Sequence, residues 1–65
     1  MDFTEAKKKM DAGCRVAEAS NPRIVFAKSN GKYIACNFDS LEFGEVSMFP
    51  PQQAAAMDWF IVGLA

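Results

Sequence analysis

Histidine is missing from the sequence, and its two cysteines, Cys14 and Cys36, are too far apart to form a C-x-x-C pair. Without histidine, the chain cannot build the Ser–His or Cys–His pairs that activate many nucleophiles. Structural zinc sites also need clustered cysteine or histidine ligands. We therefore expect no metal and no cofactor, and two reduced, mostly buried thiols of the kind found in cytosolic proteins.

Glycine-rich motifs and paired carboxylates are missing as well. The four glycines are spread through the chain and form no phosphate-binding or dinucleotide fingerprint. The eight carboxylates are also scattered, and Glu42 and Glu45, the closest candidates for a pair, are better explained as a solvated strand edge. The sequence therefore predicts a protein that is not an enzyme.

Neither a charge excess nor a long apolar run is present. The formal net charge is −1, whereas a DNA or RNA binder normally has a basic face. No apolar run approaches the roughly 20 residues that cross a bilayer, and no basic-then-apolar leader opens the chain. We expect a cytosolic protein without a nucleic-acid or membrane partner.

What the chain does have is a high apolar content in a short length. Hydrophobic residues make up 51% of its 65 residues, which we expect to form a single domain over 1–65. A chain of this size buries only about 60% of its unfolded surface and is marginal as a monomer. Small domains are commonly stabilised by disulfides, a metal or partner subunits. We therefore expect a homo-oligomer of closed symmetry, with a tetramer built as a dimer of dimers favoured.

The first segment predicts a short helix. Asp2 can cap it, and Glu5 follows three residues later, as in a capping box. Lys7–Lys9 suit the C-terminal end of the helix dipole, and Gly13 is the type of residue that ends a helix. Helical spacing places three apolar side chains on one stripe of this helix, those of Phe3, Ala6 and Met10.

Four or five antiparallel strands are expected after the helix. Asn30-Gly31 lies between two apolar runs and predicts a type I′ hairpin. Pro50-Pro51 ends the pairing, and 52–57 favours one or two helical turns. The expected strands are 14–17, 23–28, 32–37, 43–49 and 59–62. This predicts an α+β fold in which an N-terminal helix packs on a four- or five-stranded antiparallel sheet, with a short helical turn before the last strand.

The last strand contains Trp59, the one tryptophan of the chain. Both of its faces are apolar, so we expect it to be covered on both sides. We prefer the interpretation that Trp59 is an anchor, either of the core or of a subunit interface. The alternative is a wall on which a ring-shaped ligand stacks.

Both ends of the chain carry short motifs that resemble one family. Phe3–Ala6 reads F-x-E-A, Gly13–Ala17 places a basic residue and V-A after a glycine, and Ala56–Trp59 reads A-x-D-W. These motifs are similar to those of the second type of Thoeris anti-defence proteins, which are small proteins of phages and prophages. The family has an R-x-G-W-N stretch after its first strand. In this chain Ala17–Pro22 occupies that region, and Asn21 alone matches.

The resemblance implies a function and a setting. Members of the family are non-enzymatic sponges that bind cyclic nucleotide immune signals, such as cyclic ADP-ribose isomers, without cleaving them, and some bind cyclic oligonucleotides. They are α+β oligomers, typically tetramers, with pockets between subunits. The resemblance thus implies a protein that acts in the cytoplasm of an infected bacterial host.

Six residues are candidates for binding such a signal. Aromatic rings stack on bases, arginines bind phosphates, and carboxylates and amides suit ribose hydroxyls. In that order, the candidates are Phe3 and Trp59, Arg15 and Arg23, and Asp58 and Asn21. The competing interpretation places the aromatic residues in the core and the charged ones in solvent. It favours a small inhibitor or adaptor that docks on a host protein, or an accessory protein without a ligand.

Overall fold

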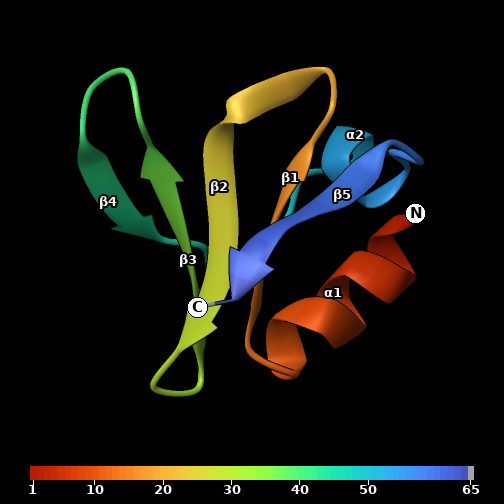
Figure 1. Cartoon of the computed structure of the whole chain (residues 1–65), viewed down its shortest axis with the longest axis horizontal. Coiled ribbons are helices and arrows are strands. Elements are labelled where there is room, and N and C mark those ends of the chain that lie inside the picture. The colour runs from red at the N-terminus through yellow and green to blue at the C-terminus, as the bar shows by residue number, and fades with distance from the viewer. Residues whose placement is uncertain (65) are drawn as a thin grey trace.

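The N-terminal helix packs on a five-stranded antiparallel sheet, and a short second helix precedes the last strand (Figure 1). This confirms the predicted fold class. The computed structural model describes residues 1–64. The elements are α1 (Phe3–Asp11), β1 (Cys14–Glu18), β2 (Asn21–Ser29), β3 (Lys32–Asn37), β4 (Glu42–Glu45), α2 (Pro51–Ala54) and β5 (Trp59–Leu64).

The strands lie in the order β4-β3-β2-β1-β5. The first four form a meander in which each strand pairs with the next, and β5 then returns to pair antiparallel with β1. As a result, β4 and β5 are the two edges of the sheet, and the chain between them carries α2 (Figure 1).

Local signals set the ends of α1 and the first tight hairpin. The Asp2 carboxylate accepts a hydrogen bond from the Glu5 backbone N–H at 2.9 Å, and Gly13 has a φ of 97°. In the β2–β3 hairpin, Asn30 and Gly31 have φ values of 53° and 77°. Positive φ at both central residues is the requirement of a type I′ turn, which the sequence predicted.

Only β3 has its expected bounds; β1 and β5 end one and two residues later than predicted, and β2 and β4 differ more. β2 begins at Asn21 and includes Pro22, because the β1–β2 pairing is irregular between Val16 and Glu18 and tolerates a residue without an N–H there. β4 ends at Glu45 and does not continue to Phe49. The ring of Phe49 instead turns onto the helix side of the sheet.

One face of the sheet, which we call the covered face, holds the core. Its buried residues are Ala6, Met10, Val16, Phe26 and Trp59. The Phe49 ring lies 4.8 Å from Phe3, 5.4 Å from Phe26 and 6.5 Å from Trp59, measured between ring centroids. Trp59 is only 2% exposed, and its indole N–H donates to the Gln53 carbonyl at 3.3 Å. The interpretation of Trp59 as a core anchor is confirmed.

The opposite face, which we call the open face, is made by the alternate residues of the same strands. From the strand register, its apolar residues are Ala17, Val25, Ala27, Ile34, Cys36, Phe43 and Phe60. The helix α1 contacts β1, β2 and β5 through the covered face. The two helices also contact each other and lie on the same side of the molecule (Figure 1). Within residues 1–64, no helix covers the open face.

The expectation that the last strand is covered on both sides is wrong for the single chain. Ile61 and Val62 are 44% and 42% exposed, and Phe60 is exposed too. The reason is that β5 is an edge strand with cover only at its start, where Trp59 meets the aromatic cluster. Edge position depends on strand order, which the local sequence pattern does not contain.

The two cysteines are half-buried free thiols. Cys14 shares the side of Val16, whereas Cys36 lies opposite Val25 on the open face. The sheet therefore separates the two sulfur atoms.

No helix among the described residues is long and apolar enough to cross a membrane.

Candidate ligand-binding face

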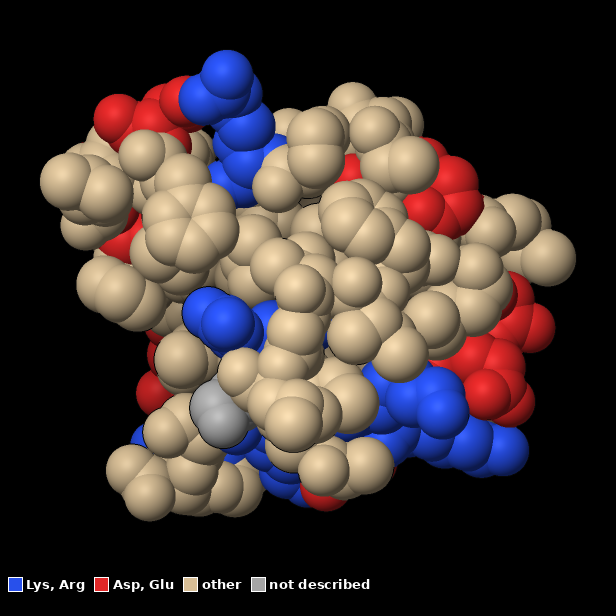
Figure 2. Space-filling view, viewed as in Figure 1, with Lys and Arg blue, Asp and Glu red and all other residues tan. Residues whose placement is uncertain are grey.

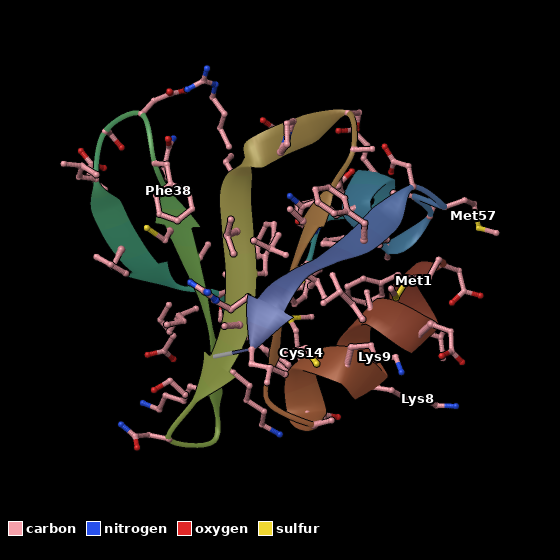
Figure 3. All side chains as sticks on the ribbon, viewed as in Figure 1. Met1, Lys8, Lys9, Cys14, Phe38 and Met57 are labelled. Carbon is pink, nitrogen blue, oxygen red and sulfur yellow. The ribbon has the colours of Figure 1, made fainter. Side chains whose placement is uncertain are left out.

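A hollow of about 160 Å³ lies on the open face. It lies over β2, β3 and β4, where Ala27 pairs with Ile34 and Cys36 pairs with Phe43. Phe38 also lines it, and Figure 3 shows the Phe38 ring at the end of β3. The lining residues are Arg15, Val25, Ala27, Ile34, Cys36, Phe38 and Phe43.

Arg15 contributes the charge of the hollow. It stands on β1 opposite Gly63 of β5. A Cβ atom placed on Gly63 would lie 3.3 Å from Arg15 Nη2, so the guanidinium extends over the glycine and uses the space that a side chain would fill. Gly63 thus permits Arg15 to lie flat along the open face.

Two other cations share the open face by strand alternation, and each has a carboxylate partner. Arg23 bonds to Asp39 at 2.8 Å, and Lys32 lies 3.5 Å from Glu45. Arg15 makes no ion pair with any residue in 1–64. Figure 2 shows charged side chains mainly toward the rim of the molecule, with uncharged atoms filling most of the middle. Arg15 is therefore the cation best placed to meet an external anion.

The predicted residues Asp58 and Asn21 lie at a different place, where β1 turns into β2. The Asp58 carboxylate accepts a hydrogen bond from the Ser20 N–H at 2.8 Å, and its carbonyl accepts one from Ala19 N–H at 2.9 Å. The Ser20 hydrogen bond lowers the pKa of Asp58. Burial, followed by the nearby Asp58 charge, raises the pKa of Glu18. Asp58 therefore fixes the turn to the start of β5, and Asn21 lies exposed beside it.

Phe3 and Trp59, the predicted stacking residues, meet each other in the core at 5.6 Å between ring centroids. Because Trp59 is buried, a ligand could stack on it only if the aromatic cluster opened. In the single chain, the six predicted residues thus fall into three groups. Phe3 and Trp59 lie in the core, Asp58 and Asn21 at the turn, and Arg15 and Arg23 on the open face.

A second polar cluster joins α1 to the β2–β3 hairpin. Asp11 accepts hydrogen bonds from the Tyr33 hydroxyl at 2.7 Å and from Lys28 Nζ at 3.2 Å. These bonds lower the pKa of Asp11, and the bond to Asp11 raises the pKa of Tyr33. Lys28 and Lys7 also lie 5.3 and 5.7 Å from the centre of the Tyr33 ring. Lys28 and Lys7 therefore have a structural role, because they contact Asp11 and the Tyr33 ring where α1 packs on the sheet.

Sequence reasoning missed Phe38, Phe43 and Gly63 as parts of the site. Phe43 could have been found from its alternation with Glu42 and Gly44, had the strand been placed at 42–45. Gly63 lies opposite Arg15 because β5 pairs with β1. The register of two strands so far apart in the chain has no local signal in the sequence.

The described part of the chain holds no group of three His, Cys, Asp or Glu side chains that could bind a metal ion. Comparison of the chain with protein-family models, with curated proteins and with solved structures found no match.

Proposed function

We propose that this protein is a non-enzymatic anti-defence sponge, which binds and sequesters a cyclic nucleotide-type immune signal in the cytoplasm of a phage-infected bacterium. The motifs at both ends of the chain supply the biological context. The structural observation that carries the proposal is the Arg15 guanidinium, which extends over Gly63 beside an apolar hollow and has no ionic partner within residues 1–64.

The hollow suits the parts of such a signal. A guanidinium binds phosphate oxygens through two parallel hydrogen bonds. The rings of Phe38 and Phe43 offer flat surfaces to a base, and stacking of this kind tolerates different bases. Val25 and Ala27 add apolar surface to the hollow that Arg15 also lines.

The size of the hollow favours binding between subunits. Its volume of about 160 Å³ is smaller than the roughly 300–1,000 Å³ of typical small-molecule pockets. A nucleotide of several hundred daltons would project from it, so a second chain is needed to enclose the ligand. This agrees with the proposed homo-oligomer, for which a tetramer is favoured.

Calorimetry against cyclic ADP-ribose isomers and cyclic di- and trinucleotides tests the proposal. We expect one of them to bind and to be recovered intact by chromatography after heat denaturation of the protein. Recovery of a cleaved product would show an enzyme instead. No binding across the panel would overturn the sponge.

Two arginine variants sharpen this experiment. Arg15→Ala should weaken binding by about 1.5–3 kcal/mol, the usual size of a hydrogen bond to a charged group. Arg23→Ala is the matched control, because Asp39 already engages that guanidinium at 2.8 Å. Equal losses in both variants would place the phosphate elsewhere.

One observation favours a second candidate, a protein-binding inhibitor or adaptor. Leu41 has a φ of 56°, which is costly for a bulky side chain, and this side chain is 74% exposed, two residues before the exposed Phe43. A polypeptide retained from infected-cell lysate in native mass spectrometry, and lost with Leu41→Asn, would favour this candidate. A released small molecule with a nucleotide absorbance spectrum would favour the sponge.

A further inference from the structure

The hollow on the open face is lined mainly by apolar side chains. Apart from Arg15, its lining consists of Val25, Ala27, Ile34, Cys36, Phe38 and Phe43. A thiol is a weak donor and a weak acceptor, so Arg15 is the one strong hydrogen-bonding side chain that the described residues contribute to the lining. A polar group that is buried without a partner is costly. The part of a ligand that enters the hollow should therefore be apolar, and its charged part should meet Arg15.

The hollow has the size of one six-membered ring. Its volume is about 160 Å³. An engineered apolar cavity of roughly 150 Å³ in another protein binds benzene. Phe38 and Phe43 also belong to the lining, and aromatic rings attract one another in offset or edge-to-face arrangements. A single aromatic ring therefore suits both the volume and the lining.

The charge available to a ligand is that of one cation. Arg15 makes no ion pair with any residue in 1–64. Arg23 is already paired with Asp39 at 2.8 Å, and the nearest acid to Lys32 is Glu45 at 3.5 Å. One guanidinium matches one carboxylate, which it binds through two parallel hydrogen bonds. A second negative charge would lose hydration at an apolar surface without a cation to compensate it, so the site favours a monoanion.

We propose that the hollow is a binding site for aromatic carboxylates, in which one six-membered ring enters the hollow and the carboxylate pairs with Arg15. Because Arg15 is itself part of the lining, the carboxylate should be only a few bonds from the ring. This chemistry occurs in free aryl acids and at a polypeptide C-terminus that ends in phenylalanine. The inference does not rest on the proposed function, although both ligands would use Arg15 and should compete.

The first test is a titration of the ¹⁵N-labelled protein with phenylacetate, followed by nuclear magnetic resonance. We expect saturable shifts of the Arg15, Gly63 and Cys36 amide signals, with one site per chain. Phenylacetamide lacks the charge and acetate lacks the ring, and each should bind at least tenfold more weakly. No saturable binding of phenylacetate, or a control that binds as tightly, would overturn the proposal.

Two arginine variants locate the carboxylate. Arg15→Ala should remove the preference for phenylacetate over phenylacetamide. Arg23→Ala is the matched control and should keep this preference, because Asp39 already engages that guanidinium. Phe43→Ser, at a 75% exposed position, should weaken the binding of phenylacetate and of phenylacetamide alike. A preference that survives in Arg15→Ala would overturn the proposal.

Two further probes identify the charge and the source of the ligand. Phenyl phosphate is a dianion above its second pKa of about 6, and it should bind no more tightly than phenylacetate. Binding that is tenfold tighter would show a phosphate site and overturn the carboxylate. N-acetyl-glycyl-phenylalanine places the same ring and carboxylate at the end of a peptide. Tighter binding of this peptide than of phenylacetate would identify a polypeptide C-terminus as the source, and equal or weaker binding would identify a free acid.

These results separate this inference from the proposed function. A protein that binds phenylacetate through Arg15 but no member of the nucleotide panel would support the carboxylate site and reject the sponge. A protein that binds a cyclic nucleotide but not phenylacetate would support the sponge and reject the carboxylate site. Displacement of a bound nucleotide by phenylacetate would support both.

Discussion

The two faces of the sheet come from alternate residues of the same strands, yet within residues 1–64 the helices and the aromatic cluster cover only one of them. On the covered face, Val16 and Phe26 meet α1, Phe49 and Trp59 and are almost fully buried. On the open face, Phe43 is 75% exposed, and Arg15 lies among apolar side chains. A strand that is apolar on both faces needs cover on both. Within residues 1–64 the helices supply one cover, and in the proposed homo-oligomer a second chain supplies the other.

The difference separates folding from binding. The core cluster contains five buried residues, and a domain of this size rarely gains more than about 3–5 kcal/mol from its core. Changes on the covered face should therefore endanger the fold. Changes at the exposed positions of the open face should leave the fold intact and affect association or ligand binding.

The largest expected effect is that of Trp59→Ala. Removing a buried tryptophan costs about 3–5 kcal/mol, which is comparable to the whole stability of a small domain. We expect loss of the cooperative unfolding transition in circular dichroism. Phe60→Ala, at the next residue on the open face, is the control and should keep the transition. Similar melting of Trp59→Ala and the parent would remove the distinction between the faces.

The next effect concerns the hairpin that helps to fix the register of β2 and β3. Gly31 has a φ of 77°, so Gly31→Ala should cost about 1–2 kcal/mol. A slip of one residue in register would exchange the two faces of a strand. Gly44→Ala is the control, because Gly44 lies in β4 without a positive φ and a Cβ there meets nothing within 4 Å. Equal urea midpoints for the two variants would contradict the I′ turn.

A pH effect is expected where α1 joins the sheet. The pKa of Asp11 is lowered by its hydrogen bonds to Tyr33 and Lys28. Its contribution to stability is therefore complete above the unfolded value of about 3.9, and it is lost as pH falls through the lower folded value. Asp11→Asn should show a smaller loss of melting temperature between pH 5 and 2, roughly, than the parent. An identical acid profile would mean that this carboxylate does not support the helix.

Glu18 should behave in the opposite way. Burial raises its pKa, so the charged form is disfavoured in the fold, and its contribution to stability declines as pH rises through its folded pKa. Glu18→Gln should therefore melt slightly higher than the parent at pH 7, with a difference that disappears in acid. A lower melting temperature at pH 7 would show that the charge is stabilising there.

The smallest effect on stability is expected for Phe43→Ser. Its ring is mostly exposed, so the substitution should change the free energy of unfolding by no more than about 0.5 kcal/mol. The same variant should weaken ligand binding, because the ring lines the hollow. A loss of stability near that of Trp59→Ala would mean that the open face is part of the core.

Much of the fold could be predicted because its signals are local. The Asp2 cap, Gly13 and the Asn30-Gly31 turn each act within a few residues, and each is confirmed. The cover of β5 was predicted wrongly, because the edge position of a strand depends on pairing between distant segments.

The candidate site was predictable only in part. Arg15 was identified from its charge and its alternation with apolar neighbours. Gly63, which gives the Arg15 guanidinium its space, was not identified, because the pairing of β1 with β5 brings it to Arg15 from the other end of the chain. Asp58 drew attention as a polar residue beside Trp59, but its hydrogen bond to Ser20 shows a structural role.

The most direct test of the central claim, that the open face binds the ligand, is a titration of the ¹⁵N-labelled protein with the nucleotide that binds in calorimetry. We predict that the backbone amide signals of Arg15, Gly63 and Phe43 shift most, and that the indole N–H of Trp59 keeps its position. Largest shifts at Trp59 and Phe3, with Arg15 and Gly63 unchanged, would place the ligand in the core cluster and contradict the account.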